Sequence, residues 1–340
     1  MKRKGFTLVE LLVVIAIIAL LMSILMPALS RVKQLAYRMM CGTHLSGIGR
    51  GMNVYAAENG DKFPIASHGQ FGQLPVWGGT GAILDWSERT MAKAYGPRNE
   101  VTVTASLYLL VKYAEVSVDM FNCRGDAQAE VFSLAFANPP ENIKDFPDAW
   151  DFGGLTTGSG PGKYCSYSYH YPYGSSGQGG YALSALSAGA SPLCADRNPR
   201  FDSISAWQVY IDGDPGTGLS TGERAPYWAA GNTGYEYKDP DKTGNAGAHE
   251  REGQNVLFVD SHVLFAKTPC VGLANDHIYK SWKGLNGDAR RPADEQDRQG
   301  ANSSETTADW SGQWGRRPHS EKDACLVGES NTYPNFTKFP

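Results

Sequence analysis

One apolar run near the start of the chain constrains the fold more than any other feature. It covers the 21 residues of Phe6–Met26 and contains a single charged residue, Glu10. As an α-helix this run would be about 32 Å long, enough to cross a hydrocarbon layer of about 30 Å. Lys2, Arg3 and Lys4 precede it, and basic residues on one flank orient that flank toward the cytoplasm. The sequence therefore predicts a single-pass membrane protein whose residues beyond the run lie outside the cytoplasm.

Glu10 distinguishes between interpretations of this run. A secretory signal peptide would be cleaved near the small residues of Ala28-Leu29-Ser30, and a plain transmembrane anchor would need no charged residue. Neither interpretation explains Glu10, because an ionised carboxylate inside lipid costs on the order of 3 kcal/mol unless it is paired. A positive charge supplied by another chain is the simplest partner. We therefore expect Glu10 to have a function.

Residues 4–17, KGFTLVELLVVIAI, resemble the prepilin leader of type IV pilins and type II secretion pseudopilins. In that family a membrane peptidase cleaves after the Gly, here Gly5, and methylates the new amino-terminal residue, here Phe6. The Glu of the motif, here Glu10, pairs with the amino terminus of the neighbouring subunit during assembly. The resemblance thus implies three kinds of partner: a prepilin peptidase/methyltransferase, other pilin-like subunits, and inner-membrane lipid.

Apolar residues continue at helical spacing beyond the membrane run. They recur mainly at three- and four-residue steps, namely at Leu29, Val32, Leu35, Met39, Leu45, Ile48, Met52 and Tyr55. Pro27 should kink the helix without ending it, because proline inside a helix is tolerated near membranes. The turn signal Asn59-Gly60-Asp61 predicts that a helix of residues 6–58, about 80 Å long, ends there. Such a helix resembles the pilin spine, whose outer half packs on a globular head.

The remaining chain has the composition of short strands joined by turns. It belongs to a sequence with 39 Gly, 19 Pro and only 19% charged residues, against a usual value of about 25%. We expect a strand and then a helix in Val101–Ala114, a strand with one buried face in Tyr164–Tyr173, a strand in Ala206–Asp212, and a hairpin in Asn255–Ala266. The predicted fold class is α+β, with a long spine helix packed on a β-rich exported head. The predicted segments are a leader (1–5), the spine (6–58), the head (59–286) and a polar C-terminal extension (287–340).

The C-terminal half is similar to a pilin-like family of unknown function whose members carry a His followed nine residues later by Asp-Gly. Here ten residues separate His249 from Asp260, and Ser261 stands where Gly is usual. The fragments Met120–Cys123 and Leu193–Pro199 also fit. This resemblance implies an αβ head and no established biochemical activity.

Two motifs suggest metal binding, each with a structural alternative. Asp260 and His262 form an Asp-x-His pair that, with His249, supplies metal ligands. We favour the alternative, in which Asp260 and Ser261 make the hairpin turn and His249 bonds nearby backbone. The acids Asp239, Asp241 and Glu250, with Gly244, match positions 1, 3, 12 and 6 of a calcium loop, but Thr243 replaces the usual acid at position 5 and no flanking helices are evident. Calcium is therefore a candidate ligand, and no other cofactor is indicated.

Six cysteines lie beyond the apolar run, at positions 41, 123, 165, 194, 270 and 325. An exported domain meets an oxidising compartment, where disulfides form. No Cys-x-x-Cys motif occurs, and spacing alone does not choose among the fifteen pairings that six cysteines allow. We expect Cys41–Cys123, which would link the helix to the head, and Cys165–Cys194, whose members both lie in strand-like segments.

The chain lacks the common signatures of enzymes and nucleic-acid-binding proteins. No Gly-x-Ser-x-Gly, Walker or dinucleotide motif occurs, so we expect no enzymatic activity. A net charge of -4 and an isoelectric point near 6.0 do not suit nucleic acid. We expect a pilin- or pseudopilin-like subunit of a type II secretion or type IV pilus-like assembly, in the bacterial inner membrane with its head in the periplasm or at the cell surface. The alternative is an exported ligand-binding or hydrolytic domain that uses the prepilin-type segment as an anchor, because the head is larger than in conventional pseudopilins.

Overall fold

The computed structural model describes eleven segments of the chain. They are residues 8–66, 76–77, 100–127, 129–134, 143–152, 161–170, 172, 182–197, 245–273, 278–279 and 326–327. The predicted processing residues Gly5 and Phe6, the predicted strand Ala206–Asp212, and Asp239 and Asp241 lie outside these segments.

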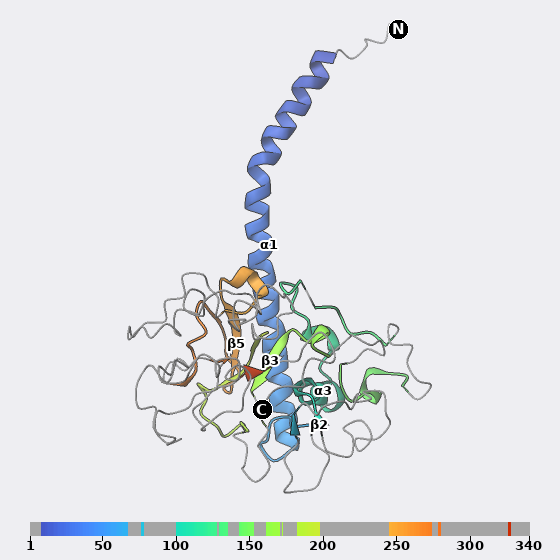
Figure 1. The fold of residues 1–340 in the computed structure, drawn as a ribbon, viewed down its shortest axis with the longest axis vertical. Helices are drawn as coiled ribbons and strands as arrows, with labels where there is room; N and C mark the ends of the chain where they lie inside the picture. Colours follow the sequence, from blue (N-terminus) through green and yellow to red (C-terminus); the bar gives the residue numbers. More distant parts are fainter. Residues whose placement is uncertain are drawn as a thin grey trace, which may run out of the picture.

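Helix α1 (Leu8–Glu58) contains 51 residues and continues through Pro27, as expected. Its apolar side chains as far as Met40 are exposed, and its buried side chains begin at Cys41. Figure 1 shows the first half projecting from the head and the second half running through it. The amino-terminal residues of the predicted apolar stripe, from Leu29 to Met39, are therefore exposed, whereas Leu45, Ile48 and Met52 are buried.

A five-stranded antiparallel sheet forms the centre of the described head. Its strand order is β6-β5-β4-β3-β7, and its strands are β3 (Tyr167–His170), β4 (Pro192–Asp196), β5 (Gln254–Phe258), β6 (Val263–Ala266) and β7 (Leu326–Val327). The predicted hairpin is β5–β6, in which Gln254 pairs with Ala266 and Leu257 with Val263. With α1, this sheet confirms the α+β fold class.

Side chains on the two faces of the sheet enter two different clusters, because successive residues of a strand point to opposite sides. Tyr167, Cys194 and Leu257 pack in the larger cluster with the buried half of α1. Ala195, Val256 and Phe258 pack on the other face with Ile278, Tyr279 and Leu326. The prediction of one buried face for the Tyr164–Tyr173 strand is therefore wrong, since all four residues of β3 are buried.

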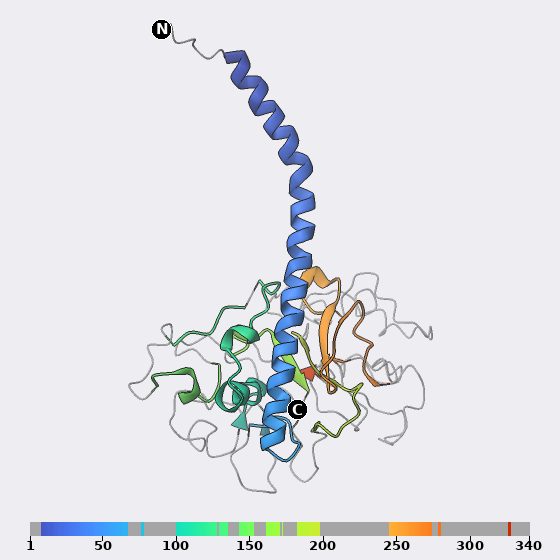
Figure 2. The ribbon, with the colours of Figure 1, turned by 180° about the vertical axis from the view of Figure 1, so that it is seen from behind.

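Helix α3 (Val103–Tyr113) and the short strand β2 (Glu100–Val101) occupy the segment predicted to hold a strand and a helix. Thr102 caps the helix by accepting a 3.0 Å hydrogen bond from the Ala105 amide. Strand β2 pairs in parallel with β1 (Val76–Trp77). Figure 2 shows the buried half of α1 passing between α3 on one side and the β5–β6 hairpin on the other.

Four 3₁₀ turns complete the described elements: η1 (Val118–Phe121), η2 (Phe146–Asp148), η3 (Pro161–Lys163) and η7 (Ala248–Arg251). Strand β7 lies within the segment predicted to be a polar extension and pairs with β3. That part of the extension therefore belongs to the head, and the Leu326 side chain is fully buried.

Glycines in α1 let the head approach the helix backbone. A Cβ atom at Gly51 would lie 2.3 Å from Cγ2 of Val116, and one at Gly49 would lie 2.8 Å from Cδ1 of Leu257. Glycine inside a helix is disfavoured by about 1 kcal/mol relative to alanine. At these two positions glycine lowers the intrinsic stability of the helix but allows close packing between the helix and the head.

We expect Gly51→Ala to lower the free energy of unfolding by about 1–3 kcal/mol, because the new methyl group would overlap Val116. The matched control is Gly42→Ala, whose Cβ would lie 3.4 Å from Oδ1 of Asn255, an ordinary contact, and which should leave stability unchanged or slightly raised. Chemical unfolding of the full-length protein in detergent, followed by tryptophan fluorescence, measures both. Equal stability of the two variants would contradict the close packing.

Candidate functional site: the long helix and its junction with the head

The exposed half of α1 is the most apolar surface in the described residues. From Leu8 to Met40 its large aliphatic side chains are mostly 45–78% exposed. Helix α1 is long and apolar enough to cross a membrane, and none of its most apolar 18-residue window is buried in the protein. A surface of this kind requires lipid or other subunits around it, since soluble proteins rarely expose large apolar patches. The helix therefore fits a single-pass, membrane-anchored protein.

Glu10 lies in the first turn of α1 and is exposed. A negative side chain in this position is favourable for the helix itself, because the amino-terminal end carries partial positive charge. The residue predicted to contact a neighbouring subunit is thus placed at the far end of the projecting helix.

The predicted disulfide Cys41–Cys123 is present, with its Cα atoms 5.3 Å apart. It joins the first buried residue of α1 to the residue that follows η1 by two positions. The two cysteines are 82 residues apart, and closing a loop of that length stabilises a fold by roughly 4–5 kcal/mol in the chain-entropy account. The disulfide therefore attaches the helix covalently at the point where it meets the head.

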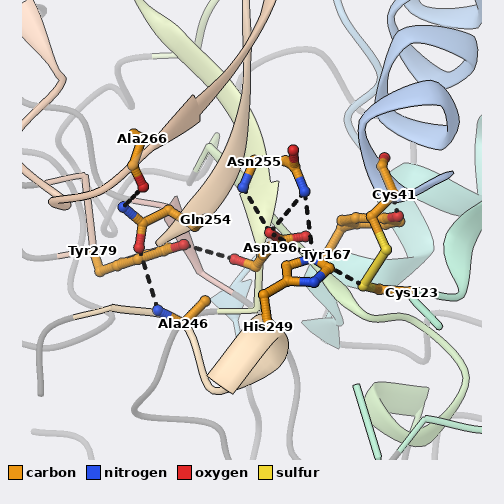
Figure 3. A network of polar contacts seen from close by, with 10 residues as sticks. All are labelled: Cys41, Cys123, Tyr167, Asp196, Ala246, His249, Gln254, Asn255, Ala266 and Tyr279. Atoms are coloured by element: carbon orange, nitrogen blue, oxygen red, sulfur yellow. Dashed lines mark hydrogen bonds and ion pairs between the residues drawn. A yellow bond between two sulfur atoms is a disulfide. The ribbon is translucent and has the colours of Figure 1, made fainter. Parts of the chain in front are cut away.

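A buried polar group surrounds this disulfide, and Figure 3 shows its contacts. We call Cys41, Cys123, Asp196, His249 and Asn255 the junction cluster. They come from α1, the segment after η1, β4, η7 and β5, and all five are buried. The cluster thus joins the helix to β4, the central strand of the sheet, and to its neighbour β5.

His249 lies at the centre of the junction cluster. Its Nε2 atom is 3.5 Å from Sγ of Cys123, 3.3 Å from Nδ2 of Asn255 and 3.5 Å from Oδ2 of Asp196. Oδ2 of Asp196 also accepts hydrogen bonds from the Asn255 amide at 2.6 Å and from its side chain at 3.2 Å. Asn255 can donate to Nε2 in the tautomer whose lone pair is on that nitrogen, and Nε2 can donate to Asp196 in the other tautomer.

The backbone that presents His249 is in an unusual conformation. His249, Glu250 and Arg251 have φ values of 56°, 56° and 59°, a left-handed region that residues with side chains rarely occupy. Helix α1 holds this segment from outside, because Gln34 donates to Glu250 and Arg38 pairs with Glu252. The strained turn is therefore fixed between the helix and the buried imidazole, as is common at functional positions.

Burial favours the neutral form of both titrating groups in the cluster. It raises the pKa of Asp196 to about 7 against the two opposing hydrogen bonds from Asn255. Burial, with the nearby charge of Arg38, lowers the pKa of His249 to about 4. Between these values the pair carries a protonated carboxyl group and a neutral imidazole, so the junction cluster needs no buried charge.

The less favoured hypothesis, a site of His249, Asp260 and His262, is not supported, because the structure does not bring the three residues together. The His249 ring meets Asn255 at the start of β5, whereas Asp260 and His262 lie in the turn after its end, about half exposed. Asp260 accepts a 3.2 Å hydrogen bond from the His262 amide, and Ser261 adopts a φ of 70°. The hairpin-turn interpretation is confirmed, but the expected backbone partner of His249 is wrong because its ring contacts side chains.

The predicted disulfide Cys165–Cys194 is wrong, because the structure has both residues as buried thiols. Cys194 lies opposite Tyr169 in the strand register, not opposite Cys165, which precedes β3 and donates to the Tyr167 carbonyl at 3.6 Å. Of the calcium candidates, the described residue is Glu250, whose carboxylate accepts from Gln34 of α1.

Sequence reasoning assigned no role to Asp196 and Asn255. Asp196 lies in the fragment Leu193–Pro199, and Asn255 begins the predicted hairpin. Asp196 ends the apolar run of β4, and its carboxyl group is fully buried. An acid directly after an apolar strand is the signal that would have marked it.

Comparisons with known proteins identify the amino-terminal segment. Residues 1–26 match the family model described as the prokaryotic N-terminal methylation motif. No curated protein and no solved structure matches the chain. The match covers Gly5, Phe6, Glu10 and the most apolar part of α1, and it confirms the prepilin-type segment.

Substitution Asp196→Asn should change how stability depends on pH. Between the ordinary pKa of 3.8 and the folded pKa of about 7, the folded protein holds a proton that the unfolded chain has released. The free energy of unfolding contributed by this group therefore falls as pH rises from about 4 to about 7. The difference between wild type and Asp196→Asn in chemical denaturation should fall over the same range.

The control for this experiment is Asp260→Asn. Hydrogen bonds from His262 lower the pKa of Asp260, so its contribution is present above the ordinary pKa and is lost as pH falls. The wild-type advantage over Asp260→Asn should consequently change in the opposite direction. A wild-type advantage over Asp196→Asn that grows with pH would show that the folded protein ionises Asp196.

Proposed function

We propose that this chain is a pilin- or pseudopilin-like structural subunit of a type II secretion or type IV pilus-like assembly. The observation that carries the proposal is the prepilin-type motif of residues 1–26, followed by a helix whose exposed half is apolar and whose other half is fixed in the head. The similarity of the C-terminal half to a pilin-like family, with its His249 motif, supports the same assignment.

The chemistry of the head supports export from the cytoplasm. A disulfide such as Cys41–Cys123 persists in oxidising compartments and is rare in reducing ones. The basic residues Lys2, Arg3 and Lys4 favour a cytoplasmic amino terminus. Together they support an inner-membrane protein with its head in the periplasm or at the cell surface.

Assembly would use the exposed half of α1. In the proposed role this surface leaves lipid to pack against the same surface of neighbouring subunits, and Glu10 pairs with the amino terminus of a neighbour. An interaction between charges is strong in an apolar surrounding, which makes it suitable for selecting subunit register. The function proposed is structural, without enzymatic activity, and the alternative is an anchored ligand-binding or hydrolytic domain.

Processing provides the first test. The mature protein should begin at Phe6 with one added methyl group on its amino terminus, and Gly5→Ile should leave the full-length precursor in the membrane. Intact-mass spectrometry of the membrane fraction measures both. An amino terminus at Arg31 would instead establish cleavage after Ser30 by a signal peptidase.

The second test is Glu10→Ala, which should leave a processed, inserted protein with a normally folded head but reduce crosslinking between subunits. Loss of one buried charge contact should lower crosslinking about tenfold, since about 1.4 kcal/mol corresponds to a factor of ten. Glu10→Asp, which keeps the charge with a shorter reach, should assemble partially.

Glu58→Ala is the matched control, because it removes an exposed acid from the other end of the same helix. It should crosslink like wild type. If Glu10→Ala also crosslinks like wild type, the anchored-domain alternative becomes the better account of the chain.

A further inference from the structure

The junction cluster brings together three side chains of the types that bind metal ions, two cysteines and one histidine. Sγ of Cys41, Sγ of Cys123 and Nε2 of His249 all lie within 4.8 Å of one another. Two of these atoms form the disulfide, so the third donor, His249, is in contact with a bond that reduction would open into two thiols.

We propose that the reduced form of this protein binds a zinc-class divalent cation through Cys41, Cys123 and His249, and that the disulfide and the metal exclude each other. Thiolate and imidazole ligands suit zinc. The proposal concerns the head alone and does not depend on the role in assembly.

The distances around His249 fit tetrahedral coordination. With bonds of about 2.3 Å to sulfur and about 2.1 Å to nitrogen or oxygen, neighbouring S and N ligands of zinc lie about 3.6 Å apart, and N and O ligands about 3.4 Å. Nε2 of His249 is 3.5 Å from Sγ of Cys123 and 3.5 Å from Oδ2 of Asp196. Oδ2 of Asp196 is therefore at a suitable distance from Nε2 to act as a fourth ligand.

The sulfur atoms need only a local movement to complete the site. Two sulfur ligands of a tetrahedral zinc ion lie about 3.8 Å apart, which is close to the separation of two thiols in contact. Two thiolates also balance the charge of a divalent cation, which removes the main cost of a metal in this fully buried position. Nε2 of His249 is the ring nitrogen that faces both Cys123 and Asp196, and an imidazole with its lone pair on that atom can bind the cation.

The chemistry of the exchange balances with a dithiol reductant. The reductant transfers two electrons and two protons to the Cys41–Cys123 disulfide and itself becomes a disulfide. The cation then replaces the two thiol protons, which are released to solvent, and a third proton is released when Asp196 binds as a carboxylate. A disulfide oxidant takes two electrons from the two thiolates and is itself reduced to two thiolates. The S–S bond re-forms and the cation is expelled, because the bonded sulfurs no longer offer two separate ligand positions.

The experiment compares oxidised and reduced full-length protein in detergent. A phosphine reductant opens the disulfide, with water supplying the oxygen of the phosphine oxide and the thiol protons. Both samples are unfolded and refolded with Zn²⁺ or Co²⁺, so that burial does not block access to the site. Bound zinc is counted after gel filtration, and cobalt is followed by its thiolate absorption bands.

The reduced protein should bind one cation per chain, and the oxidised protein should bind none at this site. Cys123→Ser should abolish the cobalt–thiolate bands of a bis-thiolate site, and its proper reference is reduced wild type, which also lacks the disulfide. His249→Gln keeps both thiols and should weaken zinc binding by at least roughly 10- to 100-fold.

Cys194→Ala is the control variant, because Cys194 is an equally buried thiol outside the three-ligand set. It should bind like wild type. Circular dichroism verifies that each reduced variant is folded. The proposal is overturned if folded, reduced wild type binds no zinc or cobalt, or if His249→Gln and Cys123→Ser bind as tightly as wild type.

Discussion

Packing of the second half of α1 against one face of the sheet is the interaction on which the described head depends. Leu45, Ile48 and Met52 of the helix are completely buried, in one cluster with Tyr167 and Leu257 of the sheet. The same helix is exposed and apolar up to Met40. The two halves of this helix therefore suit two different environments, lipid for the first half and the protein interior for the second. Gly49 allows the second half to pack closely on Leu257 of the sheet.

The junction cluster lies where these two environments meet. It combines a covalent bond, a strained turn and a buried Asp196–His249 pair. Buried polar groups stabilise a fold only when they are paired, and Asn255 contributes to this pairing by contacting both members. Such a network defines one relative position of helix, η7 and sheet more strictly than apolar packing alone.

Features that depend on local pattern were predictable from the sequence. The apolar run predicted α1, and two apolar runs around Asp260 and Ser261 predicted the β5–β6 hairpin. The helix-to-head disulfide Cys41–Cys123 was also predicted, although cysteine spacing alone did not select it. Features that depend on register were not. The Cys165–Cys194 pairing failed because Cys194 faces Tyr169 across the strands. The surroundings of His249 could not be read from the chain, because four separate segments supply its neighbours, and β7 has only two residues in a polar context.

The continuity of α1 has a mechanical consequence. The 34 residues from Leu8 to Cys41 form a lever arm of about 50 Å that is anchored to the head by the disulfide. A sideways force on the outer end produces a torque on the head. The contacts of Gln34 with Glu250 and of Arg38 with Glu252 bear this torque first, because they lie nearer the outer end than the disulfide does. The left-handed backbone of residues 249–251 is kept by the contacts around it, so a torque on the helix acts through this turn on β5 and on the centre of the sheet.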